Sequence, residues 1–186
     1  QGSKALITSL EDNCHVTGDV NLTLSAGGTA EIDIPYNSVR VLTSDNPICV
    51  GYYHLSSDYH GPIGDASQLM IPSMDRGVKR AIVKGLRTSR ITTAYLNIVT
   101  RAGNANNISM DGNNIGSQFT TSGGYSYARI SIGTQANSTH DIASTGAPFV
   151  AWVYGVGQVE DYCYSVGMTF DSIVCDTVLL SDTVCQ

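Results

Sequence analysis

Residues 147–168 carry the sequence APFVAWVYGVGQVEDYCYSVGM. An uninterrupted run of apolar and aromatic residues extends from Phe149 to Tyr154, and Gly155 and Gly157 then break it. A short apolar run bounded by glycine is typical of a buried strand that turns sharply at its end. The stretch therefore predicts a buried β-strand rather than a catalytic loop.

The rest of the chain shows the same strand-and-turn pattern and no convincing helix. Short β-branched or alternating runs recur about every 8 to 12 residues, as in antiparallel sandwiches, and Asp111-Gly112 predicts a tight turn between two of them. We predict an all-β, antiparallel β-sandwich fold, with two packed sandwich subdomains as the alternative to one. The runs are 6–9, 20–24, 30–34, 39–43, 48–54, 69–71, 78–83, 94–100, 108–110, 125–132 and 141–143.

We expect two regions along the chain. Residues 1–168 form the β domain, and if this domain contains two sandwiches, the division lies near residues 61–64. Residues 169–186 form a C-terminal extended strand, because they alternate polar and apolar residues and contain no glycine or proline.

The composition limits the classes of function. The chain has 186 residues, of which 42% are hydrophobic and 14% charged, and this is the composition of a folded globular protein. The formal net charge of -6 argues against general affinity for nucleic acid or anionic membrane. No apolar run approaches the roughly 20 residues that a membrane span requires.

The charges are unevenly distributed along the chain. No basic residue follows Arg129. Two interpretations remain: a solvated strand pair beside an acidic tail, or a basic patch on one subunit that meets the acidic end of the next. The basic cluster is Arg76, Lys79, Arg80, Lys84, Arg87 and Arg90, and the late acidic residues are Asp141, Glu160, Asp161, Asp171, Asp176 and Asp182.

The cysteines and sequons indicate an extracellular protein. The cysteines lack the spacing of a structural zinc site, so we predict disulfides. Because five is an odd number, one cysteine has no partner within the chain. It forms a bond to another chain, remains a buried free thiol, or pairs with a cysteine outside this sequence. We expect N-linked glycans at the sequon asparagines and a mature N-terminus at Gln1. The cysteines are Cys14, Cys49, Cys163, Cys175 and Cys185, and the sequon asparagines are Asn21, Asn107 and Asn137.

A succession of motifs resembles one known family. From about residue 5 to 168, their order and spacing are similar to the N-terminal domain family of IgGFc-binding proteins. The resemblance implies an extracellular, β-rich, non-enzymatic domain of mucus, matrix or bacterial surface proteins, and it does not imply Fc binding. Cys163 stands where the family has glycine between two tyrosines, which predicts a crosslinked corner. The motifs are ITSLEDN (7–13), LTLSAGGTAEI (22–32), LTSDNPICVGYY (42–53), GDASQLMIPS (64–73), AYLNIVT (94–100), ISMDGNNI (108–115), YSYARISIG (125–133) and the opening stretch.

Catalytic motifs are missing from the sequence. It has no G-x-S-x-G elbow, no H-E-x-x-H and no glycine-rich phosphate loop. We therefore predict neither enzymatic activity nor a cofactor. The best metal candidate is a loop with His54, Asp58, His60 and Asp65, but its irregular spacing favours a solvated turn. The Asp111 turn favours a hairpin over a calcium loop, and Trp152 favours a core position over a sugar platform.

The C-terminal segment, TFDSIVCDTVLLSDTVCQ, has two interpretations. It can pair with its own sandwich as an edge strand, or form a hairpin closed by Cys175 and Cys185. Alternatively, it adds to an open sheet edge of a neighbouring copy, and a repeated contact of that kind produces a filament. The side chains expected to set the register are Ile173, Cys175, Thr177 and Leu179.

These observations favour a secreted structural glycoprotein without enzymatic activity. We expect it to assemble head to tail into extracellular fibres or a matrix, by strand donation and an intersubunit disulfide. Its partners are then other copies of itself. The alternative is a monomeric extracellular adhesion module that recognises a glycan, mucin or protein through its loops.

Overall fold

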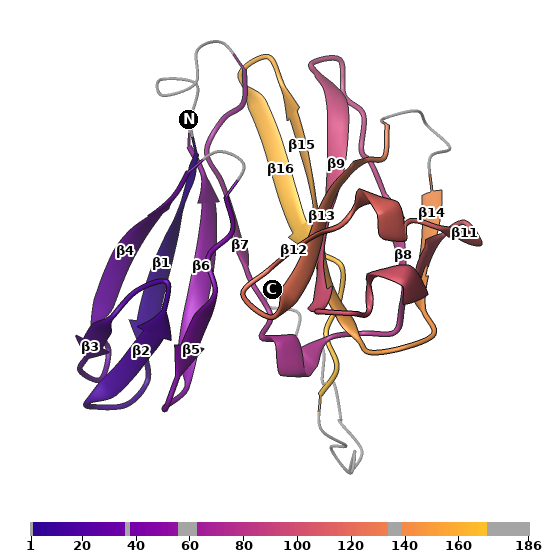
Figure 1. Cartoon of the computed structure of the whole chain (residues 1–186). Coiled ribbons are helices and arrows are strands. Elements are labelled where there is room, and N and C mark those ends of the chain that lie inside the picture. Colours follow the sequence, from indigo (N-terminus) through magenta and orange to yellow (C-terminus); the bar gives the residue numbers. More distant parts are fainter. Residues whose placement is uncertain (1, 36–37, 56–62, 134–138, 171–186) are drawn as a thin grey trace, which may run out of the picture.

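The computed structural model describes residues 2–35, 38–55, 63–133 and 139–170. Within them the protein is all-β: four antiparallel sheets and three single-turn 3-10 helices, so the predicted fold class is confirmed (Figure 1). None of the helices in these ranges has the length and hydropathy to cross a membrane.

The first sandwich pairs a four-stranded sheet, in the order β4-β1-β6-β7, with a three-stranded sheet, β3-β2-β5. Its buried core consists of Ile7, Cys14, Val16 and Leu24. The strands are β1 (Ser3–Ser9), β2 (Cys14–Gly18), β3 (Leu22–Leu24), β4 (Thr29–Ile34), β5 (Leu42–Ser44), β6 (Ile48–His54) and β7 (Ser67–Met70).

The second sandwich pairs the sheet β11-β10-β14-β8 with the five-stranded sheet β12-β13-β9-β15-β16. Its larger core includes Leu96, Ile98, Ile142, Phe149 and Val153. The elements are η1 (Met74–Arg76), β8 (Arg80–Lys84), β9 (Ile91–Arg101), η2 (Ala105–Asn107), β10 (Ile108–Met110), β11 (Asn113–Asn114), η3 (Gly116–Gln118), β12 (Thr120–Ser122), β13 (Tyr125–Ser131), β14 (Thr139–Ser144), β15 (Phe149–Gly157) and β16 (Glu160–Ser165).

The apolar run quoted above forms β15, and its burial is confirmed. Gly155 lies inside the strand, whereas Gly157 is its last residue, so the predicted strand end is confirmed at Gly157 only. A Cβ at Gly155 would lie 2.2 Å from a ring carbon of Tyr162, and one at Gly157 would lie 2.1 Å from the carbonyl oxygen of Arg90. Both positions therefore require glycine, because neighbouring groups occupy the space of a side chain. The chain turns after Gly157, at Val159, whose φ is 52°.

The hairpin predicted at Asp111-Gly112 is confirmed. Both residues have positive φ, 53° and 78°, and they join β10 to β11. Asp111 and Gly112 are residues that tolerate this left-handed conformation. The Asp111 carboxylate forms hydrogen bonds with His140 at 2.7 Å and with the backbone N–H of Asp141 at 2.9 Å. It therefore links the turn to β14.

The two sandwiches meet at a polar and aromatic seam, formed by β6 and β7 against the outer face of β15 and β16. Nδ1 of His54 lies 2.8 Å from Oδ2 of Asp161, and the two side chains are only 10% and 2% exposed. Beside this pair, the ring of Tyr52 lies 6.1 Å from Trp152, and the His54 ring lies edge-on to Tyr154 at 4.7 Å. Residues 107 positions apart in sequence thus hold the sandwiches together.

The predicted division of the β domain near residues 61–64 remains a prediction. The cores of the two sandwiches share no residue. Strand β7 follows this range and still pairs with β6, so in the fold the chain passes from the first sandwich to the second after Met70.

We predict that Gly155→Ala destabilises the protein. The new methyl group would overlap the Tyr162 ring, and overpacking of this kind costs about 1–3 kcal/mol. Urea unfolding measures the loss. The control is Gly103→Asn, because Gly103 has open space around it and asparagine tolerates positive φ. Similar losses at the two positions would contradict the packing role of Gly155.

We also predict that the seam depends on its buried acid. Asp161→Asn should lower the free energy of unfolding by about 1–3 kcal/mol, because His54 would lose its charged acceptor in a buried site. Asp65→Asn is the control: this exposed residue caps its own loop at the N–H of Ala66, and its substitution should change stability by less than about 0.5 kcal/mol. An unchanged unfolding midpoint for Asp161→Asn would argue against the seam.

Candidate assembly surface

Strand β8 ends its sheet, so one of its edges has no neighbouring strand among the described residues. The side chains alternate along it. Ala81 and Val83 face the core, whereas Ile82 is 60% exposed and Leu86, beyond the end of the strand, is 48% exposed. We call residues 80–90 the β8 strip.

The β8 strip is basic as well as apolar. The guanidinium of Arg80 makes two bonds to Asp141, at 3.0 and 2.8 Å, and this contact lowers the pKa of the Asp141 carboxyl. Lys84, Arg87 and Arg90 are exposed and form no ion pair within the described part of the chain. These three charges are available to an acidic partner.

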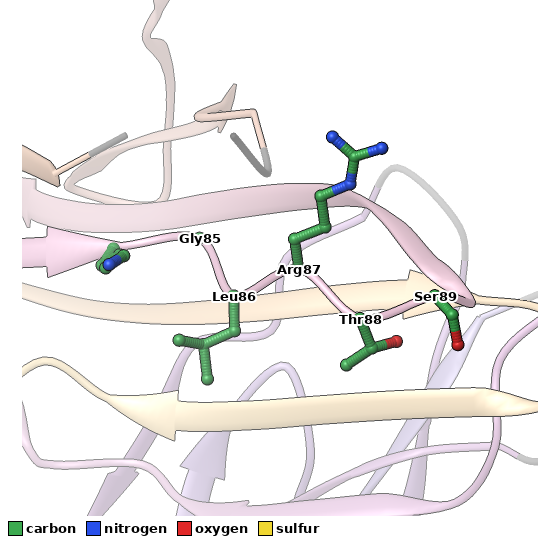
Figure 2. A pocket seen from close by; sticks show the side chains of 6 residues that line it. Gly85, Leu86, Arg87, Thr88 and Ser89 are labelled. Atoms are coloured by element: carbon green, nitrogen blue, oxygen red, sulfur yellow. The ribbon is translucent and has the colours of Figure 1, made fainter. Parts of the chain in front are cut away.

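A shallow groove of about 530 Å³ lies along the strip and is lined by residues 84–89. The segment crosses the side of the second sandwich in an extended form. Figure 2 shows that Leu86 and Thr88 point to one side of it and that Arg87 points to the other. The segment therefore carries an apolar side chain on one side and a cation on the other.

Two tyrosines from β16 reach the backbone of the strip. The N–H of Lys84 donates to the hydroxyl of Tyr164 at 3.0 Å, and that hydroxyl donates to the Lys84 carbonyl at 2.6 Å. The N–H of Leu86 donates to the Tyr162 hydroxyl at 2.7 Å. Burial raises the pKa of both phenols, so they stay neutral and can act as donor and acceptor. The hydroxyls cap part of the free edge of β8.

The structure describes three of the five cysteines, and all three are free thiols. Cys14 is buried in the first core, Cys49 is exposed, and Cys163 is half-buried. The disulfides predicted from the sequence are therefore not formed among these three, and the corner predicted to be crosslinked at Cys163 carries a free thiol whose pKa is raised by burial. Cys175 and Cys185 lie outside the described residues.

The sequon asparagines lie in different surroundings. Asn21 is exposed in the turn after β2. Nδ2 of Asn107, the atom to which a glycan would be attached, donates to Oδ1 of Asn104 at 3.0 Å, and Asn104 is itself buried and bonded to Thr100. Asn137 lies outside the described residues. Occupancy of all three stays a prediction, and the geometry favours Asn21 over Asn107.

The loop considered for a metal does not gather its residues in the described structure. His54 turns to Asp161 in the seam, and Asp65 caps its own loop. Asp58 and His60 lie outside the described ranges, and within those ranges no group of three His, Cys, Asp or Glu side chains could hold a metal ion. Sequence reasoning missed Asp161 as the partner of His54, because only the fold brings them together.

Trp152 lies in the seam rather than in the core of one sandwich. Three buried polar atoms there have no hydrogen-bond partner among the described residues: Nε1 of Trp152, Oδ1 of Asp161 and Oγ of Ser165. Nearby, the guanidinium of Arg129 lies 3.8 Å from the centre of the Tyr95 ring and donates to the Tyr154 hydroxyl. The tyrosines and the tryptophan thus join the sandwiches and do not form an exposed platform for a sugar.

The assembly strand predicted at Ile173, Cys175, Thr177 and Leu179 lies outside the described residues. The described chain ends beside residues 76–77, which precede the β8 strip. The N–H of Thr169 donates to the carbonyl of Arg76 at 2.8 Å, and its hydroxyl donates to that of Gly77 at 3.2 Å. The next residue, Phe170, is 69% exposed.

Comparison with known proteins supports the resemblance noted in the sequence. Searches among curated proteins and among solved structures gave no match to the chain. Residues 3–155 match the family model described as IgGFc binding protein, so the matched range includes the first sandwich and most of β15. The chain therefore belongs to the IgGFc-binding protein family.

Proposed function

We propose that the protein is a secreted structural unit without enzymatic activity, whose copies assemble head to tail into extracellular fibres or a matrix. Residues 169–186 of one copy would add as a strand to the body of the next. N-linked glycans would cover part of the exposed surface. Domains of this family are typically extracellular and generally without catalytic activity, which agrees with the proposal.

The observation that carries the proposal is the exposed end of the described chain together with the composition of the segment that follows it. After Thr169 it passes through an exposed phenylalanine, and the sequence continues with a β-branched segment that carries Asp171, Asp176 and Asp182. A segment of this composition favours an extended conformation and gains stability only when its backbone groups are paired. An open sheet edge of another copy offers such pairing.

Self-assembly also agrees with the polarity of the molecule. The basic strip and the acidic segment are different parts of the sequence, so a contact between the strip of one copy and the segment of another is heterologous and leaves one of each free. Such a contact repeats into a filament unless the rotation between copies closes a ring.

We expect the full chain to form high-mass species. Removal or disruption of residues 169–186 should abolish them. Two variants test this: a chain that ends at Met168, and a full-length tail-proline variant with Val174→Pro and Val178→Pro, which keeps the length but cannot form a regular strand. Size-exclusion chromatography with light scattering should find both variants monomeric, with unchanged circular dichroism. Oligomers that persist in both would contradict the proposal. A monodisperse full-length monomer would favour the alternative of a monomeric binding module.

We further expect Cys49 to be the described thiol that forms covalent links between copies. It is the exposed one, whereas Cys14 is buried and the raised pKa of Cys163 lowers its thiolate fraction. Under oxidising conditions, Cys49→Ser should reduce the disulfide-linked dimer seen on non-reducing gels, and Cys163→Ser should leave it unchanged. The opposite pattern would contradict this assignment.

A further inference from the structure

We infer that the free edge of β8, together with the groove at residues 84–89, is the acceptor for the C-terminal segment of a neighbouring copy. The inference rests on the proposed function and adds to it the surface that receives the strand. Four observations on the β8 strip support it: the direction of its backbone groups, its side-chain pattern, its charge and its position beside the capping tyrosines.

The backbone groups of β8 point alternately to β14 and to the free edge. Ser144 donates to the carbonyl of Lys79, and the ladder continues with Ala81 opposite Ile142 and Val83 opposite His140. The bonds from Lys84 to the Tyr164 hydroxyl show that residue 84 points the other way.

By the two-residue alternation of a strand, Arg80 and Ile82 also direct their N–H and C=O groups to the free edge. Within the described chain, no strand pairs with that edge. The segment 166–170 runs nearby but bonds to Ala151, Arg76 and Gly77 instead. An added strand would therefore find unused donors and acceptors at two positions. At Lys84 it would replace the tyrosine hydroxyl.

The outer face of the strip alternates basic and apolar side chains, in the order Arg80, Ile82, Lys84, Leu86. The even-numbered residues of the C-terminal segment provide the complement, Val174, Asp176 and Val178. If Asp176 lies opposite Lys84, the two valines lie opposite Ile82 and Leu86, whichever direction the added strand takes.

The same pairing fixes which face of the added strand turns inward. The odd-numbered residues, among them Ile173 and Leu179, would cover the half-buried rings of Tyr162 and Tyr164, which stack with their centres 6.3 Å apart at the side of the core. A shift by one residue would place Asp176 against these rings and the core, and burial of an unpaired carboxylate is costly. The register is therefore specified by both faces.

Charge favours this edge over the open edge at β16. Lys84, Arg87 and Arg90 have no acidic partner in the described part of the chain, and the incoming segment carries three aspartates. The edge strand β16 begins with Glu160 and Asp161 and would repel such a segment. The edge of β16 thus disfavours the acidic C-terminal segment that the edge of β8 attracts.

The decisive variant is Ile82→Pro in the full chain. Because the N–H of residue 82 points away from β14, proline there leaves the native ladder intact and removes the central donor of the free edge. We expect this variant to fold and to be monomeric in light scattering, whereas the control Ile82→Val should assemble like the unaltered chain. Assembly of a folded Ile82→Pro variant would overturn the inference.

A mixing experiment separates donation to a neighbour from pairing within one chain. The Ile82→Pro variant keeps a competent donor segment, and the tail-proline variant keeps a competent acceptor edge. Each should be monomeric, and their equimolar mixture should give a capped heterodimer of twice the mass. If the mixture stays monomeric, the strip is not an acceptor in trans.

A charge exchange tests the pairing without proline. Lys84→Glu with Arg87→Glu should weaken assembly at least tenfold, as should Asp176→Lys with Asp182→Lys, and the combination of all four in one chain should restore it. The control is Arg40→Glu with Arg101→Glu, which reverses two exposed charges outside the strip and should have no effect. No rescue by the combination would overturn the inference.

The tail-proline variant distinguishes failure of the inference from failure of the proposed function. If this variant is monomeric but all strip variants assemble, the acceptor is elsewhere and the proposed function stands. If the tail-proline variant assembles, the proposed function itself fails.

Discussion

The burial of β15 on both of its faces is the constraint on which the rest of the structure depends. One face supplies Phe149, Ala151 and Val153 to the core of the second sandwich. The other carries Trp152 and Tyr154 into the seam with β6. A strand buried on both faces cannot alternate polar and apolar residues, which explains the continuous apolar sequence. The same strand therefore contributes to the core and to the seam, although the seam is built from polar and aromatic groups.

The sequence predicted the features that depend on local chemistry. The apolar run of β15 and the Asp111-Gly112 turn follow from neighbouring residues, and both are confirmed. Strand β2 was not predicted, because its sequence CHVTG contains two buried positions only, Cys14 and Val16, on an otherwise exposed strand. The sequence predicts a strand end at both glycines of β15, but Gly155 lies inside the strand, because sequence does not show that the Tyr162 ring fills the space beside it.

The candidate surface was predictable in its charge and not in its geometry. The cluster of basic residues between 76 and 90 is visible in the sequence, and so is the acidic C-terminal segment. That β8 ends its sheet depends on pairings with β14, some 60 residues later. The hydroxyls of Tyr162 and Tyr164 reach the strip from β16, nearly 80 residues away. Contacts over such separations leave no periodic signal in one sequence.

The capped edge of β8 explains how one protein can keep an open strand edge and avoid indiscriminate pairing. Charged side chains and side-chain caps are common means of protecting an exposed edge. Here Lys84 and Arg87 place positive charge at the edge, which disfavours basic segments, and the tyrosine hydroxyls bond the backbone at Lys84 and Leu86. Tyr162 also packs over Gly155, so the residue that guards the edge is held in place by the most deeply buried strand. If a strand adds at this edge as proposed, it would meet backbone groups that the tyrosines already hold in place, which would reduce the entropy lost on association.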